Sequence, residues 1–109
     1  RKVDYLKCEN LPDGSGVDVF SSNLLKQLDV NVRHPQEREH INMYVLRNRD
    51  KYSTFFLSFD GKCARPSMRI TVDTLEDLEN ARSIFKQDDV NPWRISLLEV
   101  IKRMDPSII

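Results

Sequence analysis

The stretch MRITVDTLEDL, residues 68–78, decides the expected fold because its pattern changes from strand-like to helical at one acidic residue. Residues 68–72 are rich in branched and apolar side chains, which favour a β-strand. Beyond Asp73, apolar residues recur at the spacing of one helix face, at Leu75, Leu78, Ala81 and Phe85. We therefore expect a strand that leads directly into an amphipathic helix, with Asp73 at the junction.

Outside this stretch, strand-like and helical segments alternate along the chain. Short runs of β-forming residues predict further strands at 3–8, 17–20 and 53–59. Helical spacing behind a capping serine or a proline predicts helices at about 22–28, 36–46 and 96–104. This mixture predicts the α/β class and excludes an all-β sandwich.

The size and charge of the chain limit the classes of protein to which it can belong. A length of 109 residues fits one small domain, so 1–109 is expected to fold as a single domain. Lysine plus arginine and aspartate plus glutamate both number 17, and this zero net charge argues against a nucleic-acid binder and a polybasic membrane module. No apolar run approaches the roughly 20 residues that span a bilayer. We expect a cytoplasmic protein that binds neither nucleic acid nor membrane.

Two cysteines, Cys8 and Cys63, lie far apart in the sequence. They could pair, but a secreted scaffold of this length would normally carry more disulfides. The commoner arrangement is two reduced, partly buried thiols. The chain begins at Arg1, without a methionine or the apolar segment of a signal peptide, so we expect a piece of a longer protein.

Asp73 is the strongest candidate for chemistry. A carboxylate at the junction of a strand and a helix lies at the carboxyl edge of the sheet, where open α/β sheets bind ligands. Mg²⁺ takes oxygen ligands and needs one or two carboxylates, so Asp73 is a candidate metal ligand. The competing interpretation is that Asp73 or Thr74 only caps the helix, with Asp77 placed favourably in its first turn. The pattern alone favours the cap, because caps greatly outnumber metal sites.

The segment Arg38-Glu39-His40 is the second candidate, because it is dense in titratable groups. A histidine among such neighbours acts as an acid, a base or a hydrogen-bond donor. The competing interpretation is a surface helix with charge pairs four residues apart, and it is the commoner one. His34 and His40 lack the spacing of zinc ligands.

Several segments, taken in order, carry a resemblance to one family. They are LPDG at 11–14, VDVFS at 17–21, REHI at 38–41, YV at 44–45, MRITVDT at 68–74 and EDLE at 76–79. In this order they resemble the spore coat polysaccharide biosynthesis protein F-like group within the acylneuraminate and KDO cytidylyltransferase superfamily. The segments span nearly the whole chain, and the Arg-Glu-His and Thr-Val-Asp-Thr-x-Glu-Asp-Leu pieces are the more specific ones.

The resemblance implies a partial nucleotide-diphospho-sugar transferase (GT-A-like) fold, a three-layer α/β arrangement with a mixed sheet and flanking helices. It places the chain in the carboxyl-terminal half of such a domain, without the glycine-rich nucleotide-binding loop and the partner metal carboxylate. Enzymes of this family join a nucleoside triphosphate to a sugar or sugar acid and release pyrophosphate, using Mg²⁺. The expected reaction uses CTP and serves surface polysaccharide biosynthesis.

The resemblance also implies roles for individual residues. The metal-binding acid of the family falls on Asp73. Its Arg-Glu-His segment, near the substrate pocket and the dimer contact, gives the candidate catalytic residues Arg38, Glu39 and His40. Its glycine turn and the strand that follows face the sugar, and with the strand before Asp73 they give the candidate substrate-binding residues Gly14, Asp18 and Arg69.

The chain departs from the family pattern at Gly16, which replaces a usual acid, and at Asp18, which replaces a usual glutamate. Asn42 replaces a usual threonine and Leu75 a usual proline. Two hypotheses follow. The chain is the substrate-side and metal-side part of a nucleotidyltransferase that is inactive without the rest, or it is a non-catalytic module of the same shape for dimerisation or partner binding. The expected macromolecular partner is a second copy or the missing amino-terminal half.

Overall fold

The computed structural model describes residues 2–86 and 89–107, which divide into two compact units. The first unit contains residues 2–9 and 17–58. The second contains residues 10–16, 59–86 and 89–107. Each unit is described by itself, and the expectation of one domain over 1–109 stays a prediction.

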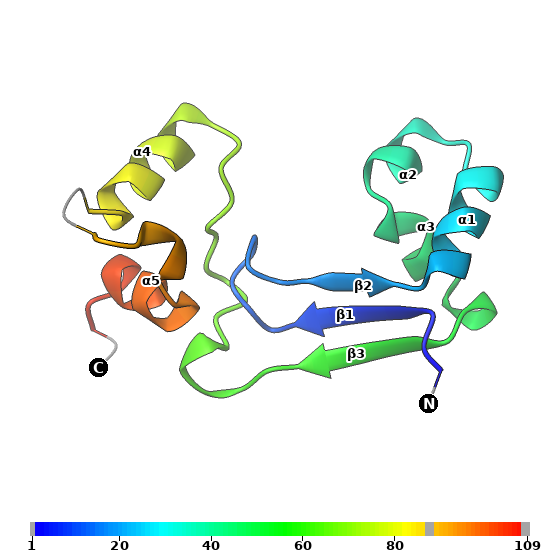
Figure 1. Ribbon diagram of the computed structural model, residues 1–109, viewed down its shortest axis with the longest axis horizontal. Helices are drawn as coiled ribbons and strands as arrows, with labels where there is room; N and C mark the ends of the chain where they lie inside the picture. The colour runs from blue at the N-terminus through cyan, green and yellow to red at the C-terminus, as the bar shows by residue number, and fades with distance from the viewer. Residues whose placement is uncertain (1, 87–88, 108–109) are drawn as a thin grey trace. The chain divides into compact units, whose positions relative to one another are not determined.

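The first unit is built on a three-stranded mixed sheet in the order β2-β1-β3 (Figure 1). The central strand β1 (Tyr5–Glu9) pairs antiparallel with β2 (Asp18–Phe20) and parallel with β3 (Thr54–Ser58). The predicted strands at 3–8, 17–20 and 53–59 are thus confirmed with slightly shorter bounds. A parallel pair requires a long connection, and the chain between β2 and β3 supplies it as helices.

Three helices follow β2 in the first unit: α1 (Ser22–Asn31), α2 (Pro35–Glu39) and α3 (Asn42–Arg47). A 3₁₀ turn, η1 (Arg49–Lys51), leads from them into β3. The start of α1 follows from local chemistry, because the Ser21 hydroxyl accepts a hydrogen bond from the Leu24 amide at 3.1 Å.

The core of the first unit lies where these helices meet one face of the sheet. Its buried side chains are Tyr5, Leu24, Leu28, Val32 and Val45. The Tyr5 ring also packs against Phe20, with ring centroids 4.9 Å apart. The amphipathic spacing of α1 therefore directs its leucines onto the first residue of β1.

The second unit contains two helices, α4 (Leu75–Ile84) and α5 (Leu97–Met104), which pack on each other. Short 3₁₀ turns, η2 (Gly61–Cys63) and η3 (Pro92–Arg94), connect its other segments. Ile84 and Ile101 are its buried isoleucines. Arg103 of α5 ties the loop after α4 to the helix, since its guanidinium contacts Asp89 at 2.9 Å and the Ile84 carbonyl at 3.0 Å.

Two sequence-based expectations about secondary structure are wrong. Residues 68–72 form no strand; their only sheet-like pairing among the described residues is an isolated bridge between Arg69 and Asp13. A strand requires a neighbour along its length, and a single turn residue does not provide one. The helix expected at 36–46 is divided at His40, whose backbone ends α2 with φ −108° and ψ 85°.

The α/β class and the mixed sheet with flanking helices are confirmed. Cys8 and Cys63 are free, partly buried thiols, as the commoner interpretation predicted. Within the described part of the chain, no helix is both long and apolar enough to cross a membrane.

Candidate functional site

The candidate site residues separate between the two units. Gly14, Arg69 and Asp73 belong to the second unit. The first unit contains Asp18 and the segment Arg38-Glu39-His40. The structure therefore brings together two groups of candidate residues, each within its own unit.

Arg69 is the centre of the group in the second unit. Its guanidinium contacts the carboxylate of Asp73 at 2.7 Å and that of Asp77 as well. Hydrogen bonding to Asp77, with a smaller contribution from Asp73, raises the pKa of Arg69. The Asp73 side chain is 72% exposed whereas that of Asp77 is 12% exposed. Asp73 is thus the carboxylate that faces solvent.

Asp77 is engaged in capping α4. Its Oδ2 accepts hydrogen bonds from the amides of Asp73 and Thr74, both at 2.9 Å, and the Thr74 hydroxyl accepts one from the Asp77 amide at 3.1 Å. This is a reciprocal capping box. Arg69 and the backbone donors hold the pKa of the Asp77 carboxyl well below its usual range. The interpretation of Thr74 as the helix cap is therefore confirmed, and Asp73 itself does not cap α4.

The expectation that Asp73 marks the carboxyl edge of the sheet is wrong, because residues 68–72 are not part of the sheet. What positions this segment is the glycine turn. The Asp13 amide donates to the Met68 carbonyl and the Ile70 amide donates to the Asp13 carbonyl, both at 2.8 Å.

Gly14 is held against the same segment. Its φ is +99°, and a Cβ atom there would lie 2.7 Å from Thr71 Cγ2 and 3.0 Å from the Thr71 amide nitrogen. Only glycine combines that backbone angle with so close an approach. The turn and the Arg69–Asp73 pair are therefore parts of one local structure, although they lie more than fifty residues apart.

A cavity of about 160 Å³ opens beside this structure in the second unit. Its polar lining comes from Arg69, Thr71, Asp77 and Asn80, and its apolar lining from residues of α4 and α5 such as Ile84 and Met104. Thr71 Oγ1 is buried and has no hydrogen-bond partner among the described residues. A buried hydroxyl normally finds a partner, so the lining is suited to a small molecule with both polar and apolar groups.

Sequence reasoning missed Thr71 and Asn80 as pocket residues and assigned Asp77 only to the helix cap. Their spacing does carry a weak indication, because Asp77, Asn80 and Ala81 are three and four residues apart on α4. That spacing is common to all amphipathic helices, however, and does not distinguish a pocket from a packed core.

In the first unit, Asp18 is directed to its neighbours. Its Oδ2 accepts hydrogen bonds from the Tyr5 hydroxyl at 2.8 Å and from Asn42 Nδ2 at 2.9 Å. These contacts join β1, β2 and the start of α3. Burial, and then the hydrogen bond to Asp18, raise the pKa of Tyr5 to about 12.

We expect the Tyr5 hydroxyl to make folding sensitive to alkaline pH. Its pKa rises from 10.0 to about 12 on folding, so the stability it contributes is complete below pH 10 and is lost as pH approaches 12. Urea unfolding of the wild type and of Tyr5→Phe, measured across this interval, should show a steeper alkaline loss for the wild type. Parallel pH profiles for the two proteins would contradict the assignment.

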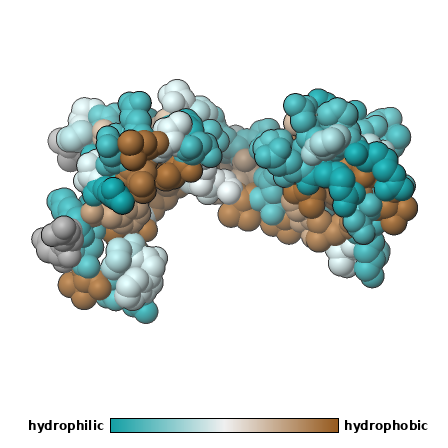
Figure 2. Space-filling model, turned by 90° about the horizontal axis from the view of Figure 1, so that it is seen from above, coloured by the Kyte–Doolittle hydropathy of each residue, from teal (hydrophilic) through white to brown (hydrophobic). Residues whose placement is uncertain are grey.

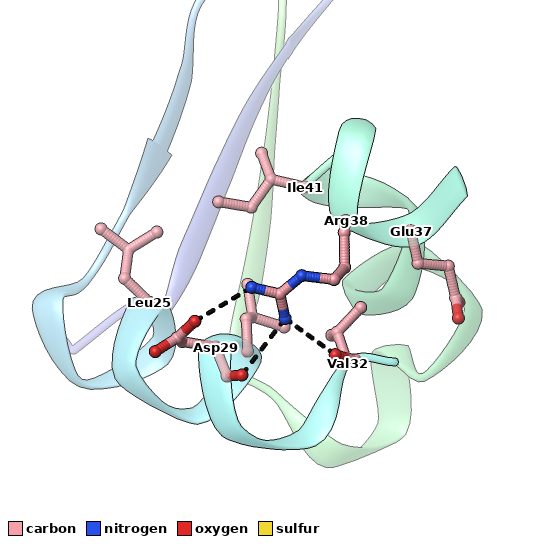
Figure 3. Close-up of a pocket in the computed structure, with 7 residues that line it drawn as sticks. Leu25, Asp29, Val32, Glu37, Arg38 and Ile41 are labelled. Carbon is pink, nitrogen blue, oxygen red and sulfur yellow. Dashed lines mark hydrogen bonds and ion pairs between the residues drawn. The ribbon is translucent and has the colours of Figure 1, made fainter. Parts of the chain in front are cut away.

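Arg38 binds the end of α1 (Figure 3). Its guanidinium donates to the carbonyls of Val32 at 2.9 Å and Asp29 at 3.3 Å and contacts the Asp29 carboxylate at 3.1 Å. The last carbonyls of a helix lack intrahelical donors, and a cation there also matches the helix dipole. In this structure Arg38 has a capping geometry.

A shallow cavity of about 130 Å³ surrounds the Arg38 side chain. Leu25 and Ile41 lie at its apolar side in Figure 3, and Glu37 lies at the far side of Arg38. Glu39 and His40 do not line it; both are exposed at the end of α2. The structure thus separates the Arg-Glu-His segment into a capping arginine and two solvent-facing residues.

Among the residues that the structure describes, no three His, Cys, Asp or Glu side chains are grouped closely enough to hold a metal ion by themselves. Asp73 provides a single outward carboxylate. Mg²⁺ is commonly held by one or two carboxylates together with water and substrate phosphates, so the residues fit a partial contribution to such a site.

Comparison with known proteins identifies what this arrangement resembles. Over 102 residues, the chain is 26% identical to the uncharacterised protein MJ1063 of Methanocaldococcus jannaschii, covering 94% of the chain and 41% of that protein. Over 90 residues, it is 28% identical to the spore coat polysaccharide biosynthesis protein SpsF of Bacillus subtilis, covering 82% of the chain and 38% of that protein. No family model matches the chain.

A solved cytidylyltransferase from Leptospira borgpetersenii has the same fold over 98% of the chain, with a TM-score of 0.68 and 28% sequence identity. The predicted relationship to the cytidylyltransferase superfamily is confirmed. The chain spans less than half the length of each of these relatives, with 45% of the Leptospira enzyme covered. This cytidylyltransferase-like chain therefore corresponds to one part of a larger fold.

Proposed function

We propose that this cytidylyltransferase-like chain is the substrate-side and metal-side part of a nucleotidyltransferase. The enzyme would activate a sugar or sugar acid with a nucleoside triphosphate, CTP in our proposal, for surface polysaccharide biosynthesis. The similarity to SpsF and to the Leptospira cytidylyltransferase supports this reaction class. The observation that carries the proposal is the cluster of Arg69 and the exposed Asp73 beside the glycine turn and the cavity.

The cluster has the chemistry that a nucleotide-sugar site requires. Asp73 would supply a carboxylate to Mg²⁺, and the ion would offset charge on the triphosphate and on the departing pyrophosphate. Arg69 neutralises Asp73 in the absence of such an ion and would bind an anionic substrate group once the metal takes the carboxylate. Gly14 keeps the turn close to Thr71, which leaves the cavity lining in place. In this proposal Asp18 supports the fold through Tyr5 and Asn42.

The proposal predicts that Asp73→Asn removes Mg²⁺-dependent nucleotide binding. In nuclear magnetic resonance titrations of this chain with CTP, amides near residues 14 and 69–77 should shift only when Mg²⁺ is present. A single protein carboxylate gives weak binding, with a dissociation constant on the order of millimolar. The variant retains the capping box, so a lost response reports ligand binding rather than unfolding.

Asp60→Asn is the matched control, because Asp60 is an exposed aspartate of the same unit that makes no side-chain cap hydrogen bond. It should titrate like the wild type. Identical Mg²⁺-dependent shifts in Asp73→Asn and the wild type would overturn the metal assignment.

A non-catalytic module for dimerisation or partner binding is the second candidate function. Two observations favour it: Arg38 is bound to the end of α1, and Asp73 is already paired with Arg69. This candidate predicts no effect of Mg²⁺ or CTP on the amides of residues 69–77. It also predicts that substitutions at Glu39 and His40 change association with a partner and leave nucleotide binding unchanged.

A further inference from the structure

One face of the sheet in the first unit carries only apolar side chains. It consists of Leu6, Cys8, Val17, Val19, Phe55 and Leu57, which we call the outer face. The strand register aligns them, since Leu6 of β1 lies between Val19 of β2 and Phe55 of β3. Cys8 lies beside Leu57, and its amide donates to the Val17 carbonyl at 3.3 Å.

The helices of the first unit leave the outer face accessible. Val17 is 60% exposed, Val19 53%, Leu57 40% and Phe55 37%. On the opposite face, Tyr5 is fully buried beneath α1 and α3. Figure 2 shows the consequence as a band of hydrophobic surface along one side of the strand-bearing unit.

The strands themselves have the composition of strands covered on both faces. In β3 the run Phe55-Phe56-Leu57 places apolar side chains on both faces, where a half-exposed strand would alternate apolar with polar. The parallel pairing of β1 with β3 points the same way, because parallel strands occur almost only in sheets covered on both sides. The outer face therefore requires a covering layer that unit 1 does not contain.

The area of the outer face indicates which kind of occupant fits. Its exposed side chains present on the order of 300–400 Å², judged from the area that apolar side chains bury in cores. A stable dimer of separate chains uses about 800 Å² from each partner. A face of half that size is better suited to a segment of the same polypeptide, because tethering supplies a high effective concentration.

We propose that the outer face binds the part of the cytidylyltransferase fold that the relatives carry outside the span they share with this chain. That part amounts to more than half of each relative, since the chain covers 41%, 38% and 45% of their lengths. It completes a layer on the second side of the sheet. This packing is independent of whether the site in the second unit binds a nucleotide.

Cys8 provides a reporter for the covering layer, because its thiol lies on the outer face. With Cys63→Ser, Cys8 is the only thiol of the chain. We would measure its labelling by N-ethylmaleimide in the 109-residue chain and in a chimera. In the chimera, this chain replaces the matching 45% of the Leptospira cytidylyltransferase. We expect Cys8 labelling to be at least tenfold slower in the chimera.

Val19→Lys and Val30→Lys form a matched pair for the same experiment. Val19 is 53% exposed on the outer face, and Val30 is 63% exposed on α1. In the chimera, Val19→Lys should restore fast labelling of Cys8, whereas Val30→Lys should leave Cys8 protected. A folded chimera labelled as fast as the chain alone would overturn the proposal.

The chain alone tests the other occupants, even if the chimera does not fold. Sedimentation should show a monomer whose Cys8 is labelled rapidly at all concentrations. A dimer that protects Cys8 would overturn the proposal in favour of a second copy. A monomer that already protects Cys8 would overturn it in favour of the chain's own second unit.

Discussion

Leu24→Ala is expected to lower the free energy of unfolding of the first unit by about 2–5 kcal/mol, the range for removing a buried leucine side chain. Leu24 is 2% exposed and packs with Tyr5 and Leu28 at the junction of α1 and the sheet. The substitution leaves a cavity beside Tyr5, whose hydroxyl must keep its contact with Asp18. Because small units are only marginally stable, such a loss would unfold much of the first unit.

Leu25→Ala is the matched control, since it removes the same atoms from the next residue of α1. Leu25 is 41% exposed, so its loss should cost less than about 1 kcal/mol. Urea unfolding combined with hydrogen exchange, read by mass spectrometry, would assign each loss to its unit. Equal destabilisation by the two substitutions would show that the leucines of α1 do not face the core as described.

Gly14→Ala is expected to destabilise the second unit by roughly 2–5 kcal/mol. A left-handed backbone angle costs a residue with a Cβ atom about 1–2 kcal/mol, and overlap with packed atoms costs about 1–3 kcal/mol more. At Gly14 the overlap is with Thr71, including its amide nitrogen at 3.0 Å. A backbone atom cannot rotate away, so the segment that carries Arg69 would have to shift.

Gly61→Ala separates the two contributions. Gly61 has φ +77°, yet a Cβ atom there would meet no heavy atom within 4 Å. This substitution should cost only the backbone angle, about 1–2 kcal/mol. Hydrogen exchange of residues 68–78 should accelerate in Gly14→Ala and remain unchanged in Gly61→Ala. Similar exchange in the two variants would contradict a close contact between the glycine turn and Thr71.

The candidate site was predictable where local chemistry sets the conformation. Thr74 and Asp77 form a capping box because side chains three residues apart reach each other's backbone amides at any helix start. The destination of Arg38 was not predictable, because its partners at 29 and 32 belong to another helix. The order of family motifs indicated the superfamily, but it did not indicate that candidate residues would fall in two units.

By itself, the sequence determined the strands of the sheet, the serine and threonine caps, the positive-φ turn at Gly14 and the relationship to cytidylyltransferases. Tertiary structure alone decided that residues 68–72 have only Asp13 as a pairing partner. It also decided that the α1 end takes Arg38 and that the outer face of the sheet stays exposed. The physical reason is that caps and turns depend on neighbours in sequence, whereas strand pairing and burial depend on segments far apart in the chain.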